Sequence, residues 1–172
     1  MMIKYCKVLF CGLLLTAFCS GCGYKVGFIK HPQLDSIAVA PVINETEIYN
    51  AASDMRMMMN EVIMQDGTFK LSDLRRADAI LYITVQNIAF AEAAQATVKD
   101  QLEYRPDEWR VLVSATYKLV IPGQGKPILS GRRDGEIRFQ AGADVESGRL
   151  KAVRQACFIV AKKIVYAVAE GW

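Results

Sequence analysis

The chain of 172 residues contains a single histidine, His31, and almost no cysteine outside its first segment. Of its five cysteines, four precede residue 23 and only Cys157 lies in the rest of the chain. One histidine near the N-terminus cannot supply a histidine-based catalytic triad or a histidine-rich metal site in a folded core. One cysteine cannot form an intramolecular disulfide. Because Cys157 falls on the apolar stripe of a predicted helix, we expect a buried structural thiol rather than a nucleophile.

Long apolar runs are also missing. The longest one, from Val8 to Phe18, has about 11 residues, whereas a helix needs roughly 20 apolar residues to span a bilayer. Lys4 and Lys7 precede this run and small residues follow it. This order is typical of a secretory signal peptide rather than of a membrane anchor.

The signal ends in Ser20-Gly21-Cys22, which resembles the lipobox of bacterial lipoproteins. In such proteins the cysteine thiol receives a diacylglyceride, the chain is cut before it, and the acyl chains hold the mature N-terminus in a bilayer. We therefore predict a signal peptide over residues 1–21, lipidation of Cys22, a tether over residues 22–33 and a folded domain over residues 34–172. Cleavage before Cys19 is the alternative, and it is disfavoured because Phe18 would stand at the cut.

The sequence has little excess charge of either sign. Its formal net charge is +3, and removal of Lys4 and Lys7 with the signal lowers this value to +1. Such a balance gives no reason to expect nucleic acid as a partner. Binding of an anion would instead require a local cluster of basic side chains.

Hydrophobic periodicity divides the predicted domain into helices and strands. We expect helices over residues 49–65 and 144–170. We expect strands over residues 34–42, 69–71, 79–91, 109–121 and 128–139, with a turn at 44–46, a hairpin loop at 122–127 and a long loop over 92–106. The order predicts an α+β two-layer sandwich, in which a mixed or antiparallel sheet of about four strands carries both helices on one face.

Both predicted helices carry an apolar stripe at helical spacing, which the sheet would bury. The stripes consist of Met55, Met58, Met59, Val62 and Ile63 in the first helix, and of Leu150, Val153, Cys157, Val160, Ile164 and Val168 in the second. Asp54 lies off the first stripe, and Gly67 suits the left-handed conformation that ends a helix. The five methionines between residues 55 and 64 indicate either this core stripe, which we favour, or an adaptable binding surface.

The predicted strands place alternate side chains on opposite faces. In the strand over 79–91, one face would hold Leu81, Ile83, Val85, Asn87 and Ala89, and the other Ile80, Tyr82, Thr84, Gln86, Ile88 and Phe90. In the strand over 128–139, a solvated face would hold Arg132, Asp134, Glu136 and Arg138. Cross-strand charge pairing explains these two carboxylates better than acid–base catalysis does. We predict that the chain is not an enzyme and uses no metal or other cofactor.

Three basic residues are expected near the predicted hairpin loop: Lys126 within it, and Arg132 and Arg133 on the strand that leaves it. Guanidinium groups bind phosphate through paired hydrogen bonds, so this end of the hairpin is a candidate site for phosphorylated lipid. A solvated turn without a ligand is the alternative.

Five segments spread over the predicted mature chain carry a family resemblance. They are Gly21-Cys22-Gly23-Tyr24, Ser36-Ile37-Ala38-Val39-Ala40-Pro41-Val42-Ile43-Asn44-Glu45-Thr46, Asp66-Gly67-Thr68-Phe69-Lys70-Leu71, Ala77-Asp78-Ala79-Ile80-Leu81 and Glu170-Gly171-Trp172. Together they resemble the lipopolysaccharide-assembly lipoprotein family LptE. The resemblance implies an outer-membrane lipoprotein that sits as a plug inside the LptD β-barrel and supports lipopolysaccharide delivery to the cell surface.

The implied partners are therefore LptD, lipopolysaccharide and the outer membrane. The predicted lipopolysaccharide-binding residues, Lys126, Arg132 and Arg133, rest on charge alone, because no motif here aligns with the basic contacts of the family. The strand that reads IAVAPVxNxT leaves a rival open, since it also occurs in lipoproteins that resemble the curli secretion channel or activators of peptidoglycan synthases. Such a protein would be a self-assembling pore subunit or an enzyme regulator facing the periplasm. Three consecutive strands between the helices favour LptE, because the rivals more often alternate strands and helices.

Overall fold

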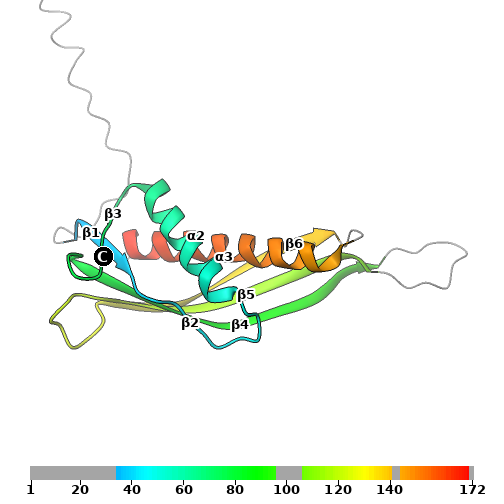
Figure 1. Ribbon diagram of the computed structural model, residues 1–172, viewed down its shortest axis with the longest axis horizontal. Helices are drawn as coiled ribbons and strands as arrows, with labels where there is room; N and C mark the ends of the chain where they lie inside the picture. Colours follow the sequence, from blue (N-terminus) through cyan, green and yellow to red (C-terminus); the bar gives the residue numbers. More distant parts are fainter. Residues whose placement is uncertain (1–33, 96–105, 141–143, 171–172) are drawn as a thin grey trace, which may run out of the picture.

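The computed structural model describes residues 34–95, 106–140 and 144–170. In chain order, its elements are β1 (Ser36–Val39), β2 (Ile43–Asn44), α2 (Ala51–Asp66), β3 (Lys70–Leu71), β4 (Ala79–Gln95), β5 (Pro106–Val120), β6 (Leu129–Gln140) and α3 (Val145–Glu170). Both helices cover the same face of one curved sheet (Figure 1). The predicted α+β sandwich is confirmed. The signal peptide, Cys22 and the tether lie outside the described residues.

The strands of the described sheet are arranged in the order β3-β1-β4-β5-β6, and β2 pairs with β4 beside β1. The sheet is mixed, because β1 and β2 run parallel to β4 whereas β4, β5 and β6 run antiparallel to one another. It has six strands instead of about four, since the two-residue strands β2 and β3 also pair with their neighbours. Asn44, which was predicted to begin a turn, is the last residue of β2.

The core lies between the helices and the face of the sheet beneath them. Its members from β4, β5 and the helices include Leu81, Ile83, Val85, Val111, Val113, Ala115, Tyr117, Leu119, Met55, Met58, Met59, Val62, Ile63, Val153, Cys157, Val160, Ile164 and Val168. Each large aliphatic side chain so buried contributes about 1.5–3 kcal/mol relative to an exposed one. The predicted core stripes are thus confirmed for all members except Leu150, which remains 49% exposed. Met57 and Met64, which lie off the first stripe, are exposed as well.

A β-bulge in β4 corrects the predicted faces of this strand. Val85 pairs with Ala115 and Asn87 with the adjacent Ser114, so that Gln86 is an extra residue without a counterpart in β5. Beyond the bulge the alternation is therefore reversed. Ile88 and Phe90 pack against the core, whereas Asn87 and Ala89 are exposed.

The helix ends follow the local sequence. At the end of α2, Gly67 adopts a φ of 70°, and its N–H donates to the carbonyl of Ile63 at 3.2 Å. At the start of α3, Asp144 accepts hydrogen bonds from the backbone N–H of Ser147 at 3.1 Å and from the hydroxyl of Ser147. This capping explains why α3 begins directly after Asp144.

Strands β4 and β5 are longer than predicted and form an arm on which the first turns of α3 lie. Residues 92–95 and 106, expected in a loop, continue the two strands. Arg149 of α3 fixes this contact, because its guanidinium lies over the rings of Phe90 and Trp109 at 5.3 and 5.2 Å from their centroids. Its Nη1 also donates to Glu146 at 2.9 Å.

Candidate functional site

The face of the sheet opposite the helices is the first candidate surface. Within the described residues, no helix covers it (Figure 1). Its rows across β4, β5 and β6 are Tyr82-Lys118-Ser130, Thr84-Thr116-Arg132 and Asn87-Ser114-Asp134. We call these nine residues the open face. Hydroxyl, amide and charged groups dominate it, so it differs from the apolar face beneath the helices.

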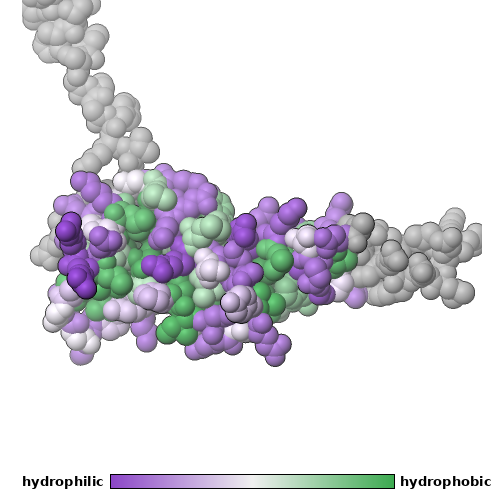
Figure 2. All heavy atoms as spheres, viewed as in Figure 1, coloured by the Kyte–Doolittle hydropathy of each residue, from purple (hydrophilic) through white to green (hydrophobic). Residues whose placement is uncertain are grey.

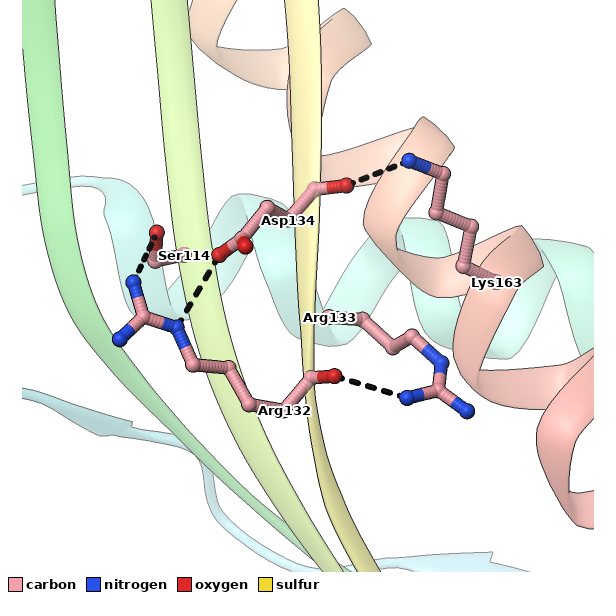
Figure 3. A network of polar contacts seen from close by, with 5 residues as sticks. All are labelled: Ser114, Arg132, Arg133, Asp134 and Lys163. Atoms are coloured by element: carbon pink, nitrogen blue, oxygen red, sulfur yellow. Dashed lines mark hydrogen bonds and ion pairs between the residues drawn. The ribbon is translucent and has the colours of Figure 1, made fainter.

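A polar network occupies the centre of the open face (Figure 3). Arg132 donates from Nε to a carboxylate oxygen of Asp134 at 3.2 Å and from Nη2 to the hydroxyl of Ser114 at 3.0 Å. Ser114 is completely buried although it lies on this face. The predicted cross-strand pairing is confirmed for Glu136, which lies 3.8 Å from Arg110 of β5, whereas Asp134 pairs with Arg132 of its own strand. The two carboxylates thus serve as ion-pair partners.

This network also determines the protonation of Asp134. A hydrogen bond from Ser114 holds the pKa of Asp134 below its ordinary value of 3.8. The bond and charge of Arg132 and the charge of Lys163 act in the same direction, whereas desolvation opposes them. Asp134 is therefore an anion at neutral pH and is poorly suited to act as a general acid.

The three residues predicted to bind lipopolysaccharide do not form one cluster. Arg132 and Arg133 are neighbours on β6 and point to opposite sides of the strand (Figure 3). The guanidinium of Arg133 lies 5.7 Å from the ring centroid of Tyr117 and donates to the carbonyl of Arg132 at 2.8 Å. Lys126 is exposed in the loop between β5 and β6. Only Arg132 belongs to the open face, so any shared ligand would have to reach around β6.

An ion pair between the helices, with a buried carboxylate and a partly exposed arginine, was not predicted from the sequence. Asp54 lies off the apolar stripe of α2 but is only 6% exposed, and its carboxylate accepts from Nε of Arg154 on α3 at 3.1 Å. The helical periodicity places Asp54 off the apolar stripe of α2, but it does not show that this side chain pairs with a residue 100 positions away in the chain. The pair joins the two helices directly.

Cys157 is fully buried beside this pair, which confirms the predicted structural thiol. Burial, and after it the charge of Asp54, raises the pKa of the Cys157 thiol to about 12. At neutral pH the sulfur is therefore protonated and unreactive.

Neither metal chemistry nor a membrane-spanning helix has a candidate in the described part of the chain. No three histidine, cysteine or acidic side chains there are grouped so that they could hold a metal ion. None of the helices described here, α3 included, combines the length and the apolarity of a membrane span.

No family model and no curated protein matches this sequence. Solved structures share its fold at low identity. A protein of the family DUF330 from Xanthomonas campestris is 13% identical with a TM-score of 0.55, and the match covers 84% of this chain and 91% of that one. The fold is found in bacterial lipoproteins. A minor lipoprotein from Acinetobacter baumannii matches with a TM-score of 0.51 and 10% identity over 80% of this chain and 94% of its own.

An oligomeric protein has the same fold. PelC from Paraburkholderia phytofirmans, solved as a dodecamer, is 12% identical with a TM-score of 0.52, and the match covers 83% of this chain and 95% of that one. At such identities the likeness establishes the architecture alone.

Proposed function

We propose that this chain is a non-catalytic lipoprotein of the LptE type, anchored to the outer membrane through Cys22, whose folded domain plugs the LptD β-barrel during lipopolysaccharide assembly. The order of the elements supports this proposal, because β4, β5 and β6 follow one another between α2 and α3 without an intervening helix. Of the sequence segments that carry the resemblance, 36–46 contains β1 and β2, 66–71 runs from the end of α2 into β3, and 77–81 leads into β4. The lipoprotein signal and the lipoprotein fold agree with this anchoring.

The open face is the surface that we assign to the barrel partner. The lumen of an outer-membrane barrel is lined by polar side chains. A face of hydroxyl, amide and paired charged groups is complementary to such a wall, whereas the opposite face is buried by the helices. The occupant proposed for the open face is therefore the polar inner wall of the barrel.

Co-purification tests this assignment with two matched variants. Tyr82 on the open face is 46% exposed, and Tyr166 of α3, which lies beside the end of α2, is 44% exposed. We expect Tyr82→Glu to release a co-expressed LptD-type barrel and Tyr166→Glu to retain it. Equal retention by both variants would contradict the open-face assignment. The absence of any barrel from the purified wild-type complex would overturn the function itself.

The lipopolysaccharide contacts predicted at Lys126, Arg132 and Arg133 form part of the same proposal. Because Arg132 and Arg133 lie on opposite sides of β6, their alanine variants are tested separately for lipopolysaccharide retention on the purified protein. A ligand on the open face would depend on Arg132 alone. Unchanged retention in Arg132→Ala, Arg133→Ala and Lys126→Ala would remove this site from the proposal.

A second candidate is a self-assembling lipoprotein ring, as expected for the curli-channel type. The shared fold with the PelC dodecamer supports it. Light scattering of the purified lipoprotein alone separates the two candidates. A monomer that binds a barrel favours the plug, whereas a stable ring favours the pore subunit. A co-purified peptidoglycan synthase would point to the enzyme regulator.

A further inference from the structure

A polar cavity of about 430 Å³ opens between α2 and the sheet edge formed by β1 and β3. Its polar lining comprises Arg56, Asn60, Ser72, Asp73 and Arg76. Val39 and Leu71 supply the apolar part of the wall. None of these residues lies on the open face, so the cavity is separate from the surface assigned to the barrel.

The backbone around the cavity is held without help from its charged side chains. The N–H groups of Arg76 and Ala77 both donate to the carbonyl of Asp73 at 3.0 Å, which closes a turn. The N–H of Ser72 donates to the carbonyl of Ile37 at 3.0 Å and fixes the start of this turn to β1. On the other side, Arg56 and Asn60 are four residues apart on α2 and are therefore neighbours on one helix face.

The arginines of this cavity differ from most others in the described residues. Six arginines elsewhere have a carboxylate or carbonyl partner: Arg110, Arg132, Arg133, Arg138, Arg149 and Arg154. Within the same described ranges, Arg56 and Arg76 have no hydrogen bond or ion pair from their guanidinium groups, and neither has Arg75. Strongly hydrophilic side chains gather at the end of the molecule where β1 and β3 lie (Figure 2). Two of the three unpaired guanidinium groups in the described part of the chain thus line one cavity.

We propose that this cavity binds a phosphate ester, with the phosphate between Arg56 and Arg76 and a hydroxyl group of the ligand donating to Asp73. Two guanidinium groups offer planar arrays of donors that match phosphate oxygens. Asp73 adds a negative charge to the same wall, which disfavours an anion that fills the whole cavity. A ligand with a neighbouring hydroxyl satisfies this acceptor, and Val39 and Leu71 contact its carbon skeleton.

The phosphate ester has two possible sources, a lipid headgroup or a water-soluble compound. The full chain in detergent is titrated with glycerol phosphate in one arm. In the other arm it is mixed with vesicles of phosphatidylglycerol, with phosphatidylcholine vesicles as the reference. Binding in the first arm identifies a soluble ligand, and selective binding in the second alone identifies a headgroup.

Matched charge variants decide whether the phosphate ester binds in this cavity. We expect Arg56→Gln and Arg76→Gln each to weaken binding about tenfold, as is typical for loss of a charge-assisted hydrogen bond. Arg75→Gln removes the same charge next to Arg76 but does not line the cavity, and we expect it to leave affinity nearly unchanged. All three side chains are exposed, so the variants are expected to fold. No binding in either arm, or an equal loss in Arg75→Gln, would overturn the proposal.

Asp73 gives an independent readout, namely selectivity. We expect the wild-type chain to prefer glycerol phosphate over inorganic phosphate, because only the ester has a hydroxyl for Asp73. Asp73→Ala should abolish this preference while inorganic phosphate binds more tightly. An unchanged preference would show that Asp73 does not meet the ligand. Neither outcome depends on a barrel partner, so failure here and failure of the plug function are distinguishable.

Discussion

Gly135 of β6 lies so close to Ala156 of α3 that a Cβ atom placed on the glycine would be 2.5 Å from the carbonyl oxygen of Ala156. The same atom would lie 2.8 Å from Cγ2 of Val160. Gly135 is also the only buried residue of β6. The absence of a side chain at this position therefore sets how closely α3 packs on the edge of the sheet.

We expect Gly135→Ala to lower the free energy of unfolding by about 1–3 kcal/mol, the usual range for overpacking a well-packed core. Because the nearest clash involves a backbone carbonyl, no side-chain rotation can relieve it. Urea denaturation monitored by circular dichroism measures the effect. Gly125→Ala is the control, since a Cβ there meets nothing within 4 Å. Equal stability of the two variants would mean that α3 can move away from β6 at little cost.

The Asp54–Arg154 pair leads to a second prediction. Arg154→Ala leaves a carboxylate with 9% side-chain exposure without its partner, and we expect a loss of about 1–3 kcal/mol. Replacing both residues with leucine should cost less than this single change, because no buried charge is then left unpaired.

Glu146→Gln serves as the control for that pair. It removes one partner of the exposed Arg149–Glu146 pair, whose Glu146 side chain is 76% exposed, and should cost about 0.5 kcal/mol or less. Thermal unfolding compares the variants. A double leucine variant that is less stable than Arg154→Ala would contradict the role given to the buried charge.

Most of the fold could be predicted because its elements have strong periodicity. The stripe from Met55 to Ile63 specified α2, and alternation specified β5 and β6. The bulge at Gln86 could not be predicted. One extra residue moves the side chains that follow it to the opposite face of the sheet, and the polar and apolar pattern of the sequence shows no interruption there. The short strand β2 also escaped, because two residues carry no detectable period, whereas β3 lies within the strand predicted over residues 69–71.

The candidate sites were harder to predict for a related reason. Arg132 and Arg133 are adjacent in sequence, and the alternation of the predicted strand already implied that they lie on opposite sides of β6; only the expectation that they share a ligand was not supported. The cavity residues Arg56 and Arg76 come from α2 and a distant turn, and no local motif links them. Their juxtaposition depends on the parallel pairing of β1 with β3, which only tertiary structure provides.

Asp134 gives a prediction about pH. Its pKa is lowered in the folded state, so its ionisation stabilises the fold above pH 3.8, and this contribution is lost as pH falls through the lower folded value. Asp134→Asn should therefore be less stable than wild type at neutral pH, and the difference should shrink at pH values below 3.8. Glu136→Gln is the control, because it removes a carboxylate from the same face of β6 that is not part of the network with Ser114. If the difference in stability between Asp134→Asn and the wild type does not change with pH, the hydrogen bonds and charges around the Asp134 carboxylate are not its cause.

Cys157 gives a final prediction, on reactivity. Because a thiol reacts as its thiolate, a rise in pKa from 9.0 to about 12 leaves ~1000-fold less of the reactive form at neutral pH. Complete burial also blocks access to the sulfur. We expect iodoacetamide to leave Cys157 unmodified in the native protein and to modify it fully in denaturant, as measured by mass spectrometry of the peptide from Gln155 to Lys162. Arg154→Ala serves as the comparison, read on the longer peptide from Ala152 to Lys162 because the cleavage site at Arg154 is lost: if the change loosens the contact between α2 and α3, it should speed labelling. Rapid labelling of the native wild-type protein would show that α3 opens often enough to expose its core stripe.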